Sequence, residues 1–198
     1  AANSVGGLTP GNWNDYLNAA GDANGVGASL GTPSVVRDGS NVYMAVQSGP
    51  GNTSNYIYWN SSADDGTTWA GWQALPTGMT TEKPPSLAVL DGTLYLCYLG
   101  SGNNEINITS LKNGSWQTQY QVAGQSATAA SLIAEDNNLA VYFIANDSSD
   151  RILKSYTNNP ANSTWTNTSV YYGNSYNQTA SSNLAVTRYN GQTYLAYQ

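Results

Sequence analysis

The chain has 198 residues, a formal net charge of −6, and charged side chains at only 9% of its positions. With six Lys and Arg in total it has little to build a basic patch from, which argues against nucleic acids and anionic membranes as partners. The absence of histidine excludes a histidine general base, a Ser–His or Cys–His nucleophile pair and a histidine zinc ligand. No run approaches the ~18 apolar residues of a membrane span. Cys97 is the one cysteine, so no internal disulfide can form.

Four apolar hairpins follow one another along the chain. Each consists of a short run with apolar residues, a two-residue turn, and a second run that is largely apolar. The turns are Asp38-Gly39, Asp91-Gly92, Asp136-Asn137 and Asn190-Gly191. Such dipeptides are typical of tight hairpin turns, which need positive φ at their central residues. The apolar second runs predict strands that are covered on both faces.

A second set of landmarks repeats between the hairpins. Turn residues precede a tryptophan in every repeat, at Trp13, Trp69, Trp116 and Trp165. A third strand is expected at 56–59, 106–108 and 151–154. Each repeat therefore offers four short strands in roughly 45–55 residues, which is the size and content of one propeller blade.

These patterns predict an all-β chain that forms one domain over residues 1–198, a four-bladed β-propeller with four antiparallel strands per blade. The blades are expected at about 31–81, 82–128 and 129–179, with the last one made by 180–198 plus 1–30. Residues 1–21 match only a third and fourth strand, so N- and C-terminal strands would close the last blade and leave no open sheet edge. A β-sandwich and an open solenoid are the competing architectures.

One turn carries a family resemblance. Residues 62–69 read Ser-Ala-Asp-Asp-Gly-Thr-Thr-Trp and resemble the Asp-box of sialidases and other β-propellers. The resemblance implies a structural role: Asp64 accepts hydrogen bonds across the turn, Gly66 permits the unusual backbone, and Trp69 packs into the blade. The repeat unit as a whole also resembles the short blades of fungal and bacterial propeller lectins, and four blades in about 200 residues resemble the hemopexin-like architecture.

A lectin is the function that this pattern favours, and it would bind without catalysis. Repeated blades create several equivalent pockets, and multivalent attachment through weak sites strengthens binding. Aromatic rings and side-chain amides are the groups that hold sugars, and the chain is rich in Tyr, Trp and Asn. The expected sites are pockets between blades, or one propeller face.

The candidate binding residues come from two sources. Trp59 and Trp72 have no counterpart in the other repeats, which makes them harder to explain as core. Asn55, Glu105 and Asp150 stand at similar repeat positions at the start of the third strand, and Asn103 and Asn104 lie in the loop before Glu105. Loops between second and third strands share one propeller face, so we expect these polar residues there.

Two further function classes stay open. The resemblance to sialidases implies three arginines that grip a carboxylate, but Arg37, Arg151 and Arg188 occupy different repeat positions. Another glycoside hydrolase would need two carboxylates across one cleft, ~5 Å or ~6.5–9.5 Å apart, and no pair stands out. A propeller scaffold that binds a protein through an acidic face is the third class.

The remaining expectations concern ions, partners and compartment. No cofactor is expected, although Asn146, Asp147 and Asp150 form an oxygen-rich loop that could hold Ca²⁺. The expected partners are glycans or glycoproteins, with a homo-oligomer as a further possibility. Low Lys content and abundant Asn, Ser, Thr and Tyr favour an extracellular protein.

Overall fold

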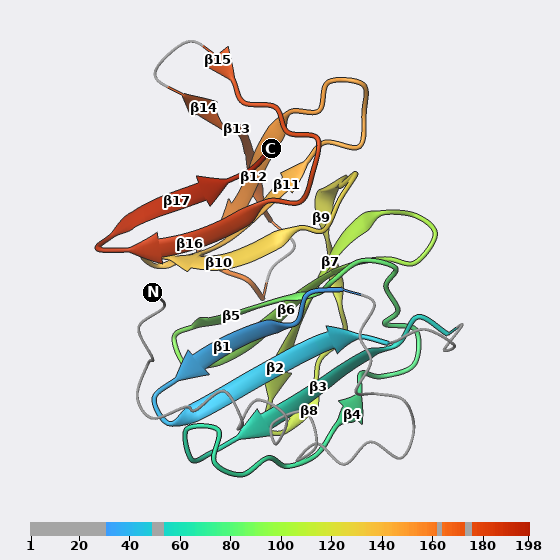
Figure 1. Cartoon of the computed structure of the whole chain (residues 1–198), viewed down its shortest axis with the longest axis vertical. Helices are drawn as coiled ribbons and strands as arrows, with labels where there is room; N and C mark the ends of the chain where they lie inside the picture. The colour runs from blue at the N-terminus through green and yellow to red at the C-terminus, as the bar shows by residue number, and fades with distance from the viewer. Residues whose placement is uncertain (1–30, 49–53, 162–163, 173–175) are drawn as a thin grey trace, which may run out of the picture.

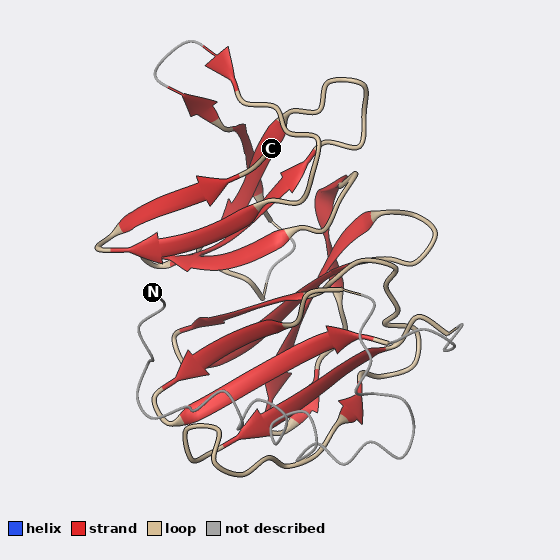
Figure 2. Ribbon diagram, in the orientation of Figure 1, coloured by secondary structure: helices blue, strands red, loops and turns tan. Residues whose placement is uncertain are grey.

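The computed structural model describes residues 31–48, 54–161, 164–172 and 176–198. Its regular structure is β-strand throughout these ranges (Figure 2), and within them no helix is long and apolar enough to cross a membrane. The inner part of the fold contains β1 (Ser34–Asp38), β2 (Asn41–Gln47), β5 (Ser86–Leu90), β6 (Thr93–Leu99), β10 (Ser131–Glu135), β11 (Asn138–Ile144), β16 (Ala185–Tyr189) and β17 (Gln192–Ala196). The other strands are β3 (Ile57–Ser62), β4 (Gln73–Ala74), β7 (Glu105–Lys112), β8 (Ser115–Trp116), β9 (Tyr120–Gln125), β12 (Ile152–Thr157), β13 (Thr166–Ser169), β14 (Tyr171–Tyr172) and β15 (Tyr176–Asn177).

The strands form three antiparallel sheets and two hairpins (Figure 1). The first sheet is β1-β2-β3-β4, the second is β5-β6-β7-β8 with β9 also paired to β7, and the third is β10-β11-β12-β13. The hairpins are β14–β15 and β16–β17. The four predicted apolar hairpins are confirmed as β1–β2, β5–β6, β10–β11 and β16–β17.

The turns Asp91-Gly92 and Asn190-Gly191 adopt the backbone that their sequences predict, whereas in the first hairpin Asp38 belongs to β1 and pairs with Asn41, so the turn is Gly39-Ser40 and not the predicted Asp38-Gly39. Asp91 and Gly92 have φ of 50° and 70°, and Asn190 and Gly191 have φ of 49° and 73°. Two successive positive φ values twist the chain so that the flanking strands can pair. The turn at Asp136 also has positive φ, at 50°.

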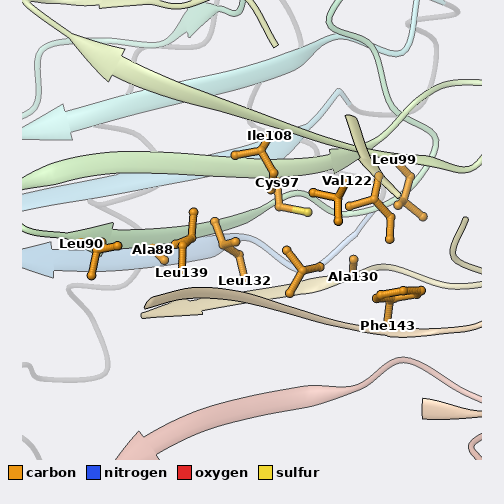
Figure 3. Close-up of a cluster of buried hydrophobic side chains, with 12 residues drawn as sticks. Ala88, Leu90, Cys97, Leu99, Ile108, Val122, Ala130, Leu132, Leu139 and Phe143 are labelled. Carbon is orange, nitrogen blue, oxygen red and sulfur yellow. The ribbon is translucent and has the colours of Figure 1, made fainter. Parts of the chain in front are cut away.

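Successive sheets pack face to face, and each junction has its own apolar cluster. The first cluster joins the first and second sheets and includes Ala45, Ile57 and Leu87. The second joins the second and third sheets and includes Cys97, Leu132 and Phe143 (Figure 3). The third joins the third sheet to β16–β17. One face of each sheet thus covers the opposite face of the next.

Serine hydroxyls also link neighbouring inner strands. The N–H of Leu87 donates to Ser34 Oγ at 2.9 Å, and the N–H of Leu132 donates to Ser86 Oγ at the same distance. Ser131 Oγ donates to the carbonyl of Leu184 at 2.8 Å. The starts of β1, β5, β10 and β16 therefore converge, and together they surround an axial cavity of about 390 Å³.

The first sheet and the β16–β17 hairpin stand at the two ends of this row of packed sheets, and both expose apolar side chains. Val35 on β1 is 55% exposed, and Tyr189 and Tyr194 on β16–β17 are 67% and 52% exposed. The predicted closing strands within residues 1–21 lie outside the described residues, as does Trp13. The number of blades and the closure of the ring therefore remain predictions.

Candidate functional site

The structure corrects the repeat alignment at the start of the third strand. Asn55, Asn104 and Asp150 have φ of 53°, 57° and 49°, so they share the left-handed backbone conformation. Their carbonyls accept the N–H groups of Thr81, Ser126 and Ala180. Glu105, which the sequence aligned with Asn55 and Asp150, lies one position later in the repeat. The left-handed conformation is easier for Asn and Asp than for most residues, so a turn-forming role accounts for these side chains.

Trp59 lies in the core. It is 9% exposed, and its ring meets that of Trp116 edge to face, with centroids 5.5 Å apart and an interplanar angle of 89°. Its counterpart in the second sheet is Ile108, whose cross-strand partner Tyr120 packs against Trp165 with centroids 6.5 Å apart. An aromatic ring thus fills this place at both junctions, from the third strand in one sheet and from β9 in the other. This packing explains why Trp59 is unrepeated in sequence.

Trp72 is half-buried, and its Nε1 is enclosed without a hydrogen-bond partner among the described residues. It stands immediately before β4, away from the polar loops that the sequence selected with it. The structure therefore does not gather the seven predicted residues into one site. It brings Glu105 and Asn103 together, and it leaves Trp59 and Trp72 in the first sheet.

A pocket lies at the junction of the second and third sheets, and we call it the junction pocket. It has a volume of about 580 Å³, within the usual range for small-molecule sites. Apolar groups are supplied by Val122, Ala123, Phe143, Ala145 and Leu153, and polar side chains by Glu105, Gln121, Gln125, Asn146 and Asp147. Gly124 completes the lining.

The pocket exists because one connection is short. In the first sheet, Leu75 pairs with Ile57 and Thr80 pairs with Tyr56, so residues 76–79 form the connection between these two paired positions. In the second sheet only residues 123–124 link the equivalent positions, at a β-bulge next to Glu105. The longer connection buries Met79 in the first cluster at 5% exposure. The shorter one has no such side chain, and the space stays open.

The carboxylate of Glu105 is held in place by two amides. Asn103 Nδ2 donates to its Oε2 at 2.8 Å, and Gln121 Nε2 donates to the same oxygen. Asn103 Oδ1 also accepts the N–H of Glu105 at 3.0 Å. This arrangement orients a charged acceptor at the pocket wall without using its second oxygen, Oε1, in any bond to the described residues.

Asp147 supplies the second carboxylate of the pocket. The hydroxyl of Ser149 and its backbone N–H both donate to Asp147, and they hold the pKa of this carboxyl below its ordinary value. Arg151 lies 3.7 Å away and acts in the same direction. Asp147 is therefore ionised at neutral pH. It is exposed, and it accepts hydrogen bonds.

The equivalent junction between the first and second sheets is closed by its own polar contacts. Ser101, the counterpart of Asn146, accepts a hydrogen bond from Asn55 Nδ2 at 2.9 Å and donates to Glu82 Oε1 at 2.9 Å. Met79 fills the space below. By contrast, the side chain of Asn146 makes no hydrogen bond within the described part of the chain. The two junctions share the same backbone pairing. They differ in whether the polar side chains are already hydrogen-bonded to each other or are available to a ligand.

The loop 146–150 does not assemble a metal site in the described residues. Asp147 is engaged by Ser149 and Arg151, and the Asp150 carbonyl accepts the N–H of Ala180. No group of three or more acidic, Cys or His side chains gathers anywhere in the described ranges. This geometry gives no support to the Ca²⁺ site that the sequence left open.

Sequence reasoning missed Gln121, Gln125 and Phe143, and it considered Asn146 and Asp147 only as ion ligands. Gln121 and Gln125 lie on β9, a strand that pairs with β7 through an irregular register. Phe143 lies in a fully apolar run, where nothing distinguishes a pocket-lining residue from a core residue. The unequal spacing between the fourth-strand region and the next hairpin was the one available signal.

The three arginines are separated and individually paired. Arg37 contacts Asp65 at 2.6 Å, Arg151 contacts Asp147, and Arg188 contacts Asp136. The first pair belongs to the first sheet, the second to the third sheet, and the third links β16 to the β10–β11 turn. They do not converge to grip one carboxylate.

Comparison with known proteins identifies the family. The BNR repeat-like domain matches residues 10–198, and a search of curated proteins found no match. An α-L-arabinofuranosidase of the GH43 type from Clostridium thermocellum has a similar structure, with TM-score 0.55 and 17% identity; the match covers 86% of this chain and 61% of that one. An exo-β-1,3-galactanase from Phanerochaete chrysosporium has TM-score 0.57 and 12% identity, with 86% and 44% covered.

A GH43 β-1,3-galactosidase gives TM-score 0.52 and 15% identity, with 69% of this chain and 31% of that chain covered. This chain therefore spans less than two thirds of each of these structures. At such low identity the likeness shows a common propeller-like fold. The family match extends over nearly the whole sequence, and the chain belongs to the BNR repeat-like domain family.

Proposed function

We propose that this chain is a carbohydrate-binding module, a propeller lectin that holds a saccharide in the junction pocket and does not cleave it. The observation that carries the proposal is the composition of this pocket. Apolar groups of Val122, Phe143 and Leu153 form part of its wall, and oriented carboxylates and amides form the rest. A sugar presents both kinds of surface, C–H groups on its ring faces and hydroxyl groups around its rim.

The charges of the pocket select the class of saccharide. Glu105 and Asp147 accept hydrogen bonds, so they suit ligands that present hydroxyl or amino groups. They repel uronic and sialic acids, and the nearest arginine, Arg151, already pairs with Asp147. Neutral or amino sugars are the expected ligands. The similar structures act on neutral sugars, which agrees with this choice.

A glycoside hydrolase is the second candidate, because two carboxylates line the same cavity. Hydrolysis needs one carboxyl in its protonated form to act as the acid. Asp147 does not meet this need, since its pKa is lowered by Ser149. The axial cavity is lined by Thr, Pro, Ser, Ala, Asn, Leu and Val, without a carboxylate among its described residues. Glu105 is then the carboxyl left for the acid role in the junction pocket, and the assay below tests this enzyme; binding without cleavage is the function that we propose.

The four-bladed ring is part of the same proposal. Its support is that β1, β5, β10 and β16, the first strands of the four hairpins, begin around one axial cavity. The open edge of β17 would pair with residues 1–21, as the repeat pattern predicts. The junction pocket lies between two fully described sheets, so the binding proposal does not depend on this closure.

The test is a glycan array followed by titration calorimetry on the best neutral ligand. Glu105→Gln removes the charged acceptor, and a hydrogen bond to a charged group contributes about 1.5–3 kcal/mol, so affinity should fall about ten- to hundredfold. Glu82→Gln is the matched control, because Glu82 serves the closed junction. Equal affinities for the two variants would remove the junction pocket as the site. Release of a chromophore from a glycoside, lost in both Glu105→Gln and Asp147→Asn, would establish the enzyme instead.

A further inference from the structure

The turn between the third strand and the following tryptophan differs in length among the sheets. Ser62, Leu111 and Thr157 occupy the same register, opposite Val42, Leu94 and Leu139. From these positions the chain reaches its tryptophan at residues 69, 116 and 165. The second sheet uses a tight turn, in which Asn113 and Gly114 both have positive φ. The first and third sheets have longer turns.

The longer turn of the first sheet is the Asp-box, and its hydrogen bonds make it rigid. Asp64 accepts the N–H of Thr68 at 2.8 Å and its hydroxyl at 2.7 Å, and Ser62 Oγ donates to Asp64 at 2.7 Å. Together these bonds, the Thr68 N–H first, lower the pKa of Asp64 to about 2. In the third sheet Thr157 Oγ1 accepts the N–H of Asn159 at 3.1 Å, just as Ser62 Oγ accepts the N–H of Asp64 at 3.3 Å in the first.

Each longer turn forms a pocket with the start of the second strand of its own sheet. In the first sheet the pocket has about 290 Å³ and is lined by Asn41, Tyr43 and Trp69, among others. In the third sheet it has about 430 Å³ and is lined by Asn138, Tyr156 and Thr164, among others. Asn41 and Asn138 both begin the second strand. We call these two cavities the turn pockets.

The turn pockets share a chemistry that the junction pocket lacks. Both described linings contain tyrosine, asparagine and threonine, the pocket of the first sheet adds serine, alanine and tryptophan, and neither lining has a charged side chain. They also lie at the opposite end of the third strand. On β12, Leu153 lines the junction pocket and Tyr156 lines a turn pocket.

We propose that the two turn pockets are a second class of binding site, for uncharged saccharide units. This inference rests on the proposed function for its ligand class, but it uses different residues. A tyrosine ring provides an apolar surface for a sugar ring, and Asn and Thr side chains provide donors and acceptors for its hydroxyls. With sites at both ends of the third strands, one chain can hold two glycans and link them.

Glu105→Gln weakens the junction pocket about ten- to hundredfold, so calorimetry with neutral oligosaccharides on this variant isolates the turn pockets at ligand concentrations too low to fill the weakened site. In this background we expect residual binding that falls to half the number of sites with Asn138→Ala and is lost with Asn41→Ala added. Thr93→Ala is the matched control, because Thr93 begins the second strand of the sheet with the tight turn, and it should leave the residual binding unchanged. Circular dichroism melts show that each variant is folded. Asn138→Asp gives a second route, since a charge in this neutral pocket should also abolish the site.

The outcomes separate this inference from the proposed function. If Glu105→Gln removes all binding at these low ligand concentrations, the turn pockets are not sites and the junction pocket stands. If Glu105→Gln binds as the wild type does, and the Asn41 and Asn138 variants do not, the turn pockets stand and the junction pocket falls. Binding at the same low ligand concentrations that survives all the asparagine variants overturns the turn pockets. No binding of any saccharide by the wild type overturns both.

Discussion

Gly124 is the position at the junction pocket where one added methyl group should lower the stability of the fold most. Its φ is +133°, a conformation that residues with a side chain rarely adopt, and an added Cβ would lie 3.2 Å from Cζ and 3.3 Å from Cε2 of Phe143. Backbone strain of this kind costs about 1–3 kcal/mol. Phe143 is 1% exposed, so its ring cannot move away without disturbing the second cluster. We expect Gly124→Ala to lower the free energy of unfolding by about 2–3 kcal/mol.

Gly102→Ala is the matched control. Gly102 has φ of +79°, and an added Cβ would meet nothing within 4 Å. The left-handed backbone conformation destabilises the folded state by about 1–2 kcal/mol when alanine replaces glycine. The lower conformational entropy of the unfolded chain offsets about 0.4–1 kcal/mol of this loss. The net loss should therefore be about 0–1.6 kcal/mol. Urea unfolding followed by tryptophan fluorescence measures both variants. If Gly124→Ala were no more destabilising than Gly102→Ala, the close packing on Phe143 would be refuted.

Three other substitutions test the rest of the framework. Ser86→Ala removes the hydroxyl that links β5 to β10 and leaves a buried N–H unpaired, so urea unfolding should show a loss of about 1–3 kcal/mol. Lys154→Met removes a partner of the buried Glu135 carboxylate and should lower the free energy of unfolding by about 3 kcal/mol at pH 7. Burial raises the pKa of Glu135, but hydrogen bonds led by the one from Lys154 lower it overall. The difference in stability between wild type and variant should therefore vanish as the pH falls below the ordinary value of 4.5 and through the lowered pKa. Thr68→Val should move the NMR titration midpoint of Asp64 from about 2 towards 3.8, and an unchanged midpoint would contradict the role of the hydroxyl.

Much of the fold could be predicted because its signals are local. Asp-Gly and Asn-Gly dipeptides set the hairpin turns, and the apolar runs beside them became the inner strands. The turn-and-tryptophan landmark also holds, since Trp116 and Trp165 pack between sheets. These features depend on a few neighbouring residues, so sequence alone carries them.

The candidate site could be predicted only in part, because its causes are not local. Asn103, Asn104 and Glu105 are three polar residues in a row, and sequence could not show which of them takes the left-handed turn position. Trp59 looked unrepeated because its counterpart on the third strand of the second sheet is Ile108, and the aromatic ring that fills the same place, Tyr120, lies on β9. The pocket itself arises from a difference in connection length, which becomes visible only when the strand pairing is known.

That difference has a consequence for how such chains acquire new binding sites. The ladder of backbone hydrogen bonds is the same on both sides of residues 76–79 and of residues 123–124. Losing or gaining two residues there can open or plug a recess while the supporting strands stay as they are. Neighbouring sheets of one repeat family can thus come to bind different ligands while their strand pairing stays the same. A pocket could be opened or closed by design if this short connecting segment were transferred from one sheet to the next.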